Sequence, residues 1–260
     1  MSDEHAQRVE AAFSLQASAF EDPRFNRVFT ADAEWLFADL PLGADDLVLD
    51  VAAGTGHIAR RLAPSVRGVV ALDATAAMLA TGKAEADAAF LSNIIFTRGD
   101  AAALPFLDQS FDVVVNRFAL HHFEDPDGPL GEMVRCLRVG GRIAVADMVS
   151  DEDPAVAEYM DELERLRDPS HTRMLRAAEL VDRLSALGIG SPVLASREVE
   201  RPLAPWLQQT ATDQAAAARI VAAFEAELSG GAVTGLAPRR LDDELHFTQR
   251  FASVVGVKAG

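Results

Sequence analysis

The stretch VLDVAAGTGHIAR, residues 48–60, decides the fold of this chain. Its apolar beginning is typical of a strand buried in a parallel sheet, and its glycine-rich turn leads into a helical pattern. Gly54, Gly56 and Ala59 match the spacing G-x-G-x-x-G/A, in which small residues let the backbone approach a ligand closely. Asp50 stands ahead of this turn, where the strand ends. The stretch therefore predicts a ligand-binding strand–loop–helix unit.

Four further apolar runs follow the first one, with helical patterns between them. The runs cover residues 67–74, 93–101, 110–120 and 140–149. The clearest helical pattern, 75–90, begins at Thr75, a residue type that often caps helix N-termini. Strands that alternate with helices predict an α/β fold, Rossmann-like and doubly wound around a mostly parallel sheet. Ligands of such sheets bind beyond the carboxyl ends of the strands.

The C-terminal half predicts a lid and the completion of the same sheet. Helical patterns cover 153–166, 174–187 and 212–228, and strand patterns cover 192–200 and 245–259. We expect the two late strands to form an antiparallel hairpin, which completes a seven-stranded sheet within a single domain. Its expected parts are an N-terminal helical cap (1–45), a cofactor-binding core (46–149), a lid-like substrate-side insertion (150–245) and a final strand (246–260).

The composition narrows the class of partner. A formal net charge of −16, from 24 basic and 40 acidic residues, disfavours nucleic acid and anionic membrane surfaces. Cys136 is the only cysteine, so disulfides and thiolate metal clusters within one chain are excluded. The N-terminus has no pattern of a signal peptide, and no apolar run approaches the ~18 residues of a membrane span. We expect a cytoplasmic monomer or homodimer that acts on a small molecule and holds no metal.

Two cofactor classes fit the glycine-rich turn. A dinucleotide would place its pyrophosphate at the helix N-terminus and its ribose near an acid about 20 residues further on, a role open to Asp73. S-adenosylmethionine fits better, because Asp50 suits an ammonium group and is unfavourable beside a pyrophosphate. Asp100 follows the third strand and can address an adenine amino group, while Met78 offers a soft thioether to the adenine face.

Four segments in this order resemble a known family. They are VLDVAAGTGH, ALDATAAML, GDAAALPFLDQSFDVVVNRFALHHF and EMVRCLRVGGRIAVADM. They are similar to the ordered motifs of the class I S-adenosylmethionine-dependent methyltransferases, and above all to the bacterial small-molecule branch that includes the ubiquinone and menaquinone C-methyltransferases. The resemblance covers residues 10–150 and continues more weakly through 152–173.

This resemblance implies a set of contacts to S-adenosylmethionine. The implied residues are Phe20, Asp50, Ala52, Gly54, Gly56, Asp73, Ala74, Met78, Asp100, Ala101 and Asn116. In the family, the residue at the position of Asp73 accepts hydrogen bonds from the ribose hydroxyls, and Asn116 would pass near the sulfonium. Phe20 stands where the family usually has tyrosine, so the ring that caps the cofactor is kept and its hydroxyl is lost.

Two histidines are candidates for catalysis. Methyl transfer needs mainly alignment, and a general base adds to the rate where the acceptor must lose a proton. His121 follows the fourth strand, and His171 lies in RLRDPSHTR, from which it could point at the acceptor. His122 shares the first position, and either neighbour could instead bind the backbone at a strand-to-helix corner. For Arg117 we favour a surface ion pair over substrate contact.

The sequence therefore predicts an enzyme, an S-adenosylmethionine-dependent methyltransferase acting on an oxygen, nitrogen or carbon atom of a small organic molecule. The Asn/Asp-Pro-Pro-aromatic motif of amide and base methylation is absent from residues 116–119. One alternative is a protein of the same fold that binds the cofactor but catalyses a non-methylating step such as a cyclisation. The others are a dinucleotide-dependent oxidoreductase and a pure binding module.

Overall fold

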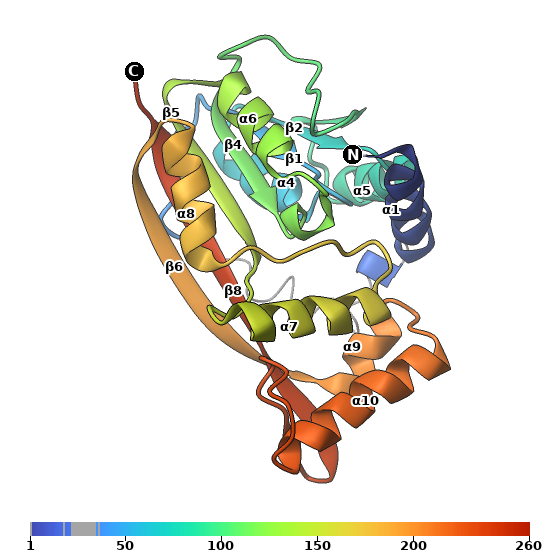
Figure 1. The fold of residues 1–260 in the computed structure, drawn as a ribbon. Coiled ribbons are helices and arrows are strands. Elements are labelled where there is room, and N and C mark those ends of the chain that lie inside the picture. The colour runs from blue at the N-terminus through green and yellow to red at the C-terminus, as the bar shows by residue number, and fades with distance from the viewer. Residues whose placement is uncertain (1, 18, 22–34, 36) are drawn as a thin grey trace.

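The computed structural model describes residues 2–17, 19–21, 35 and 37–260, so part of the expected N-terminal cap lies outside the described residues. A single sheet runs through the molecule, and helices cover both of its faces (Figure 1). Its strands are β1 (Leu47–Val51), β2 (Gly68–Asp73), β3 (Ile94–Arg98), β4 (Phe111–Arg117), β5 (Leu137–Met148), β6 (Ile189–Pro202), β7 (Arg239–Leu241) and β8 (Glu244–Lys258).

The helices follow the predicted alternation. They are α1 (Asp3–Gln16), α4 (His57–Leu62), α5 (Ala76–Ala88), α6 (Asp127–Cys136), α7 (Pro154–Arg167), α8 (Ala177–Ala186), α9 (Leu203–Gln209) and α10 (Gln214–Leu228). Within the described residues, three short 3₁₀ turns join them, η1 (Ala19–Glu21), η2 (Ala63–Ser65) and η3 (Leu120–His122). None of the described helices is long and apolar enough to span a membrane.

The strand order is β3-β2-β1-β4-β5-β8-β6, with β7 paired to β8. Strands β1 to β5 are parallel, and β8 inserts antiparallel between β5 and β6. The predicted α/β fold, mostly parallel with a late antiparallel pair, is confirmed. The sheet has eight strands and not the predicted seven, because the sequence missed β7, which is only three residues long. The sequence also missed α9, which contains Pro205. Pro205 lies in the first turn, where a missing N–H costs no intrahelical bond.

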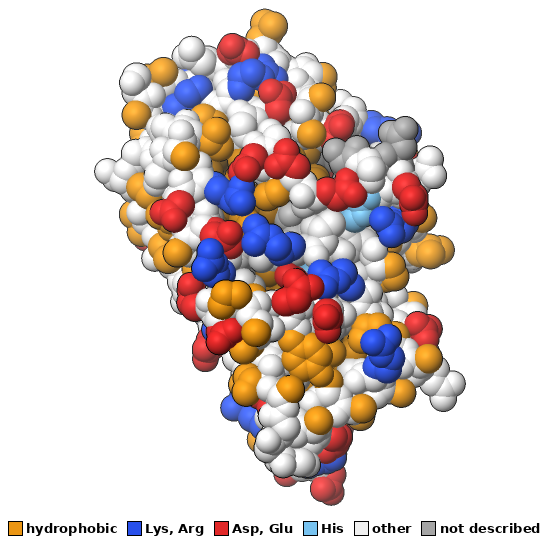
Figure 2. Space-filling model, viewed as in Figure 1, with side chains coloured by type: hydrophobic (Ala, Val, Ile, Leu, Met, Phe, Trp, Pro, Cys, Tyr) orange, Lys and Arg blue, Asp and Glu red, His pale blue; other side chains and the backbone are white. Residues whose placement is uncertain are grey.

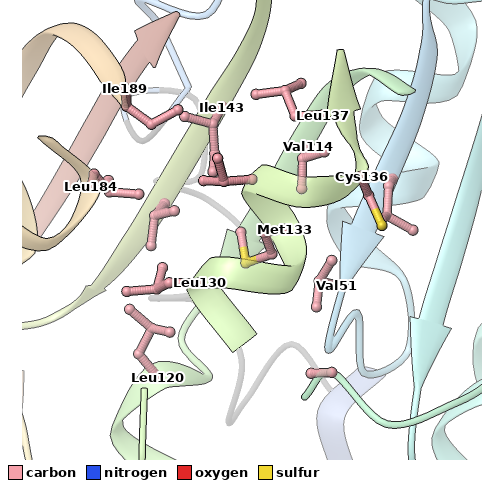
Figure 3. Close-up of a cluster of buried hydrophobic side chains, with 14 of the residues drawn as sticks. Val51, Val114, Leu120, Leu130, Met133, Cys136, Leu137, Ile143, Leu184 and Ile189 are labelled. Carbon is pink, nitrogen blue, oxygen red and sulfur yellow. The ribbon is translucent and has the colours of Figure 1, made fainter. Parts of the chain in front are cut away.

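Apolar side chains fill both faces of the sheet. One cluster lies between the sheet and helices α6 and α8, where Val51 and Val114 meet Leu130, Met133 and Leu184 (Figure 3). A second cluster packs α4 and α5 against the opposite face. Each large side chain buried in this way contributes about 1.5–3 kcal/mol, so the central strands are held from both sides.

A third apolar cluster organises the helices of the expected insertion. Trp206 from α9, Phe224 from α10 and Met160 from α7 pack with Phe247 of β8. These helices form the lower lobe of the molecule, over the extended ends of β6 and β8 (Figure 1). Strand β6 lies within the range 150–245 and belongs to the main sheet, so the covering helices come from two separate segments.

Helix α5 packs directly on the glycine-rich turn, and Gly82 permits the contact. A Cβ atom added at Gly82 would lie 2.2 Å from the carbonyl oxygen of Thr55. By contrast, a Cβ atom at Gly131 in α6 would meet nothing within 4 Å. Close packing therefore requires a glycine at position 82, whereas position 131 has room for a larger side chain.

We predict that Gly82→Ala lowers the free energy of unfolding by about 1–3 kcal/mol, because the overpacked helix must shift away from the turn. The matched variant Gly131→Ala should raise that free energy by about 0.5–1 kcal/mol, since alanine is the better helix former. Urea unfolding followed by circular dichroism measures both. Equal effects of the two substitutions would contradict the close packing of α5 on the turn.

Candidate active site

A cavity opens at the carboxyl ends of β1, β2, β4 and β5. Its wall comes from the turns after these strands, from α1 and η1, and from the ends of α7 and α9. On the face shown in Figure 2, basic side chains are interspersed with acidic ones and do not gather in one patch. Because its wall includes both strand ends and the ends of α7 and α9, the cavity lies between the parallel core and the helices of the insertion.

The turn after β1 is built from left-handed backbone. Gly54 and Gly56 have φ of 58° and 73°, which glycine adopts without steric cost. Ala52 has φ 53° and lines the cavity, an uncommon conformation for a residue with a Cβ atom. Such strain persists only where surrounding structure enforces it, and it is typical of ligand-binding turns.

Asp73 ties this turn to helix α5. Its Oδ2 accepts the Gly54 N–H at 2.8 Å, and its Oδ1 accepts the Thr75 N–H at 2.8 Å. Burial raises the pKa of Asp73 above its ordinary value, against the opposing effect of these two hydrogen bonds. Thr75 occupies the predicted N-cap position of α5, but its side chain makes no cap hydrogen bond.

Asp50 and Arg117 bring opposite charges to the same part of the cavity wall. Burial raises the pKa of Asp50 to about 7, although the positive charge of Arg117 and the Ala59 N–H at 3.0 Å oppose the shift. Burial lowers the pKa of Arg117 to about 10, so it remains a cation at neutral pH. The structure places Arg117, half-buried at the end of β4, in the cavity wall, so contact with a ligand is open to it.

Most of the predicted cofactor residues meet at this cavity. Those that line it are Phe20, Asp50, Ala52, Gly54, Asp73, Ala74, Met78, Asp100 and Ala101. Gly56 is not part of the wall, and its absent side chain leaves room for the Phe96 ring. Asn116 lies behind the wall, where its Nδ2 donates to the Val51 carbonyl at 2.8 Å. Its Oδ1 is buried without a hydrogen-bond partner among the described residues.

Three buried histidines cluster beyond the end of β4. His121 lines the cavity, and its Nδ1 lies 2.6 Å from Oδ1 of Asp147, at the end of β5. Burial of the His121 ring lowers its pKa, but the Asp147 carboxylate outweighs this, and the net pKa lies above the ordinary value. The ring centre of His122 lies 4.1 Å from that of His121, with the rings tilted by 45°. Burial together with the charge of His121 holds the pKa of His122 well below the usual range.

His171 belongs to the same cluster but does not line the cavity. Its Nε2 lies 2.7 Å from Oδ1 of Asp161, and its ring centre lies 5.5 Å from that of His121. The prediction that His171 points at the acceptor is at odds with this placement, because the side chain is turned back to α7. Of the two histidines predicted for catalysis, His121 is thus the one that lines the cavity, and the carboxylate of Asp147 lies behind it. His122 and His57 line the cavity as well.

The sequence did not anticipate the rest of the wall. Its further residues include Phe118, Met148, Arg167, Asp168, Gln209 and Thr210. Phe118 has φ 53°, a second strained residue at the end of a strand. Arg167 ends α7 and Asp168 is its C-cap, and Gln209 ends α9, the helix that the sequence missed. The described residues contain no group of three His, Cys, Asp or Glu side chains that could hold a metal ion.

Comparisons with known proteins agree with this geometry. A family profile described as "Methyltransferase domain" matches residues 49–145. The uncharacterized methyltransferase YcgJ of Bacillus subtilis is 36% identical over 166 residues, which make up 63% of this chain and 64% of YcgJ. A demethylmenaquinone methyltransferase of Clavibacter sepedonicus is 32% identical over 174 residues, covering 65% of this chain and 69% of that relative.

The solved structures include one of these relatives. The crystal structure of YcgJ superposes with a TM-score of 0.79 at 27% identity and covers 87% of this chain and 97% of that one. Sheet order and glycine-rich turn define an α/β protein with a cofactor pocket at the carboxyl edge of its sheet. The chain belongs to the S-adenosylmethionine-dependent methyltransferases, and the family and cofactor predicted from the sequence are confirmed.

We predict that Asp147→Asn lowers the pKa of His121, because it removes the carboxylate that favours the imidazolium. A folded pKa above the ordinary 6.5 means that His121 stabilises the fold below pH 6.5 and loses this effect as pH rises through the folded pKa. The variant should therefore lose more stability at pH 5.5 than at pH 8.5.

Titration of the histidine ring signals by NMR, with urea unfolding at both pH values, measures this effect. Asp161→Asn is the control, since it removes the carboxylate of His171 and should leave the His121 titration in place. An unchanged His121 titration in Asp147→Asn would contradict the assigned pair.

Proposed function

We propose that this protein transfers the methyl group of S-adenosylmethionine to an oxygen, nitrogen or carbon atom of a small organic molecule, as a cytoplasmic monomer or homodimer. One observation carries the proposal. A continuous cavity is lined by nearly all of the residues that the family resemblance assigns to the cofactor, and it extends on to a second set of residues from α7 and α9. The first part suits the cofactor, and the second leaves room for an acceptor.

The residues of the first part fit the cofactor chemically. Each oxygen of Asp73 already accepts one backbone N–H, which leaves acceptor capacity toward ribose hydroxyls. Asp50 and Arg117 together match a zwitterionic amino acid, with the carboxylate of Asp50 for its ammonium and the guanidinium for its carboxylate. When bound, the cofactor would supply an electrophilic methyl group on a sulfonium.

The contribution of the chain would be alignment, exclusion of water and one proton acceptor. Alignment of two bound reactants can lower a barrier by about 7–11 kcal/mol. His121, with Nδ1 held by Asp147, presents its remaining ring nitrogen as a base for an acceptor that must lose a proton. Such a base contributes about 10²–10⁴-fold to a rate.

Calorimetric titration tests the cofactor assignment. We expect micromolar binding of S-adenosylmethionine, weaker binding of 5′-methylthioadenosine, which lacks the amino-acid end, and no binding of NAD. Asp73→Asn should weaken both adenosine ligands at least tenfold, whereas Arg117→Gln should weaken S-adenosylmethionine and leave 5′-methylthioadenosine unchanged. Preference for NAD, or no binding of S-adenosylmethionine, would overturn the proposal.

The same titration has a predicted pH dependence. With a pKa of about 7, Asp50 is neutral at lower pH and anionic at higher pH, so the affinity for the cationic ammonium should rise from pH 6 to pH 7.5. Asp50→Asn should remove this rise. The affinity for 5′-methylthioadenosine should stay level over the same range, and an equal rise for that ligand would assign the dependence to another group.

A further inference from the structure

The end of the cavity formed by α7 and α9 is backed by one chain of buried hydrogen bonds. Arg167 Nε donates to Glu164 Oε2 at 2.9 Å, and Glu164 Oε1 accepts from Gln249 Nε2 at 3.3 Å. Gln249 Oε1 accepts from Arg201 at 2.7 Å, and Arg201 donates in turn to Gln209 Oε1 at 3.1 Å. Both ends of the chain, Arg167 and Gln209, line the cavity. We call these two residues the donor wall.

The direction of each amide in this chain is forced. An arginine has only donors, so Gln249 and Gln209 must both turn their oxygens toward Arg201. The NH₂ group of Gln209 is then the part of that amide left for the cavity. The donor wall therefore offers hydrogen-bond donors at both of its residues.

Arg167 is fixed in place and keeps its terminal nitrogens for a ligand. Its Nε is bound by Glu164, and its guanidinium lies 4.6 Å from the ring centre of Trp206. Among the described residues, no hydrogen bond or ion pair engages its two Nη atoms. A guanidinium anchored in this manner is already oriented for a planar, bidentate partner.

Charged groups of both signs lie along this series of hydrogen bonds. Arg167 and Arg201 are its cations, and Glu164, which is 0% exposed, is the carboxylate that accepts from Arg167. Burial and the charge of Arg167 lower the pKa of Arg201 to about 9, which still leaves it protonated at neutral pH. Asp168 also lines the cavity, and its Oδ1 accepts from the Ser170 N–H and hydroxyl at 2.9 and 2.5 Å. Burial opposes its ionisation, but the interactions with His122 and Arg167 lower the pKa of Asp168 to about 2.

We propose that the donor wall binds a carboxylate of the methyl acceptor, so that the substrate is an organic acid. The inference rests on the proposed function, since it takes the remainder of the cavity as the cofactor site. The terminal nitrogens of Arg167 and the NH₂ group of Gln209 can only donate, and the oxygens of a carboxylate, which only accept, are complementary to them. Phe118 and Met148 line the same cavity and would contact the apolar body of the acid. The carboxylate would serve as an anchor, and another atom of the acid would receive the methyl group.

The test uses benzoate and benzamide, two probes of nearly the same shape that differ in charge. Calorimetric titration is carried out on the full chain, with and without S-adenosylhomocysteine. We expect benzoate to bind at least tenfold more tightly than benzamide. Arg167→Gln should abolish this preference. Arg173→Gln should keep it, because Arg173 pairs with Glu179 and does not line the cavity.

A second variant covers the case in which Arg167→Gln fails to fold, since that change leaves Glu164 buried without its guanidinium. Gln209→Glu keeps an acceptor for Arg201 and places negative charge at the donor wall, so benzoate binding should fall at least tenfold. Equal binding of the two probes by the natural protein, or a preference that survives in both variants, would overturn the inference. Loss of S-adenosylhomocysteine binding would instead count against the proposed function, and the probes without cofactor still test the donor wall.

Discussion

The parallel pairing of β1 with β2 and β4 is the constraint on which the whole site depends. The register sets Val51 beside Leu72 on one side and Asn116 on the other, so that all three strands end at the same edge. Parallel strands turn their carboxyl ends in one direction, and the connections that follow must leave from this edge. Asp50, Asp73 and Arg117 are therefore brought together by backbone pairing before any of them meets a ligand.

Close packing then converts this edge into a shaped pocket. Gly82 lets α5 approach the turn after β1, and Asp73 accepts an N–H from each of the two elements. Left-handed backbone at Ala52 and Phe118 bends the chain at two strand ends that face the cavity. Left-handed backbone at residues with a Cβ atom is strained, and burial of the Asp73 carboxylate requires its desolvation. The core packed on both faces of the sheet stabilises the fold against these costs.

The two ends of the cavity follow different electrostatic designs. At the cofactor end, single charges from neighbouring strands lie within reach of one another, and burial shifts the pKa values of Asp50 and Arg117. At the other end, charge is distributed along a hydrogen-bonded chain from Arg167 to Gln209. We propose that the first arrangement suits the zwitterionic end of the cofactor and the second an anionic acceptor, so that charge would distinguish the two ligands within one cavity.

The sequence by itself determined the parallel core, the cofactor class and which residues at the ends of β1, β2 and β3 line the cavity, because those residues lie in short segments around single strand ends. The hydrophobic periodicity and the glycine spacing involve residues that are close together in the chain, so they can be recognised from the sequence alone. Only the tertiary structure decided that His121 faces the cavity while His171 turns to Asp161. It alone also joined Arg167 to Gln209, since that chain crosses α7, β6, β8 and α9, and no local pattern records which buried polar groups will meet.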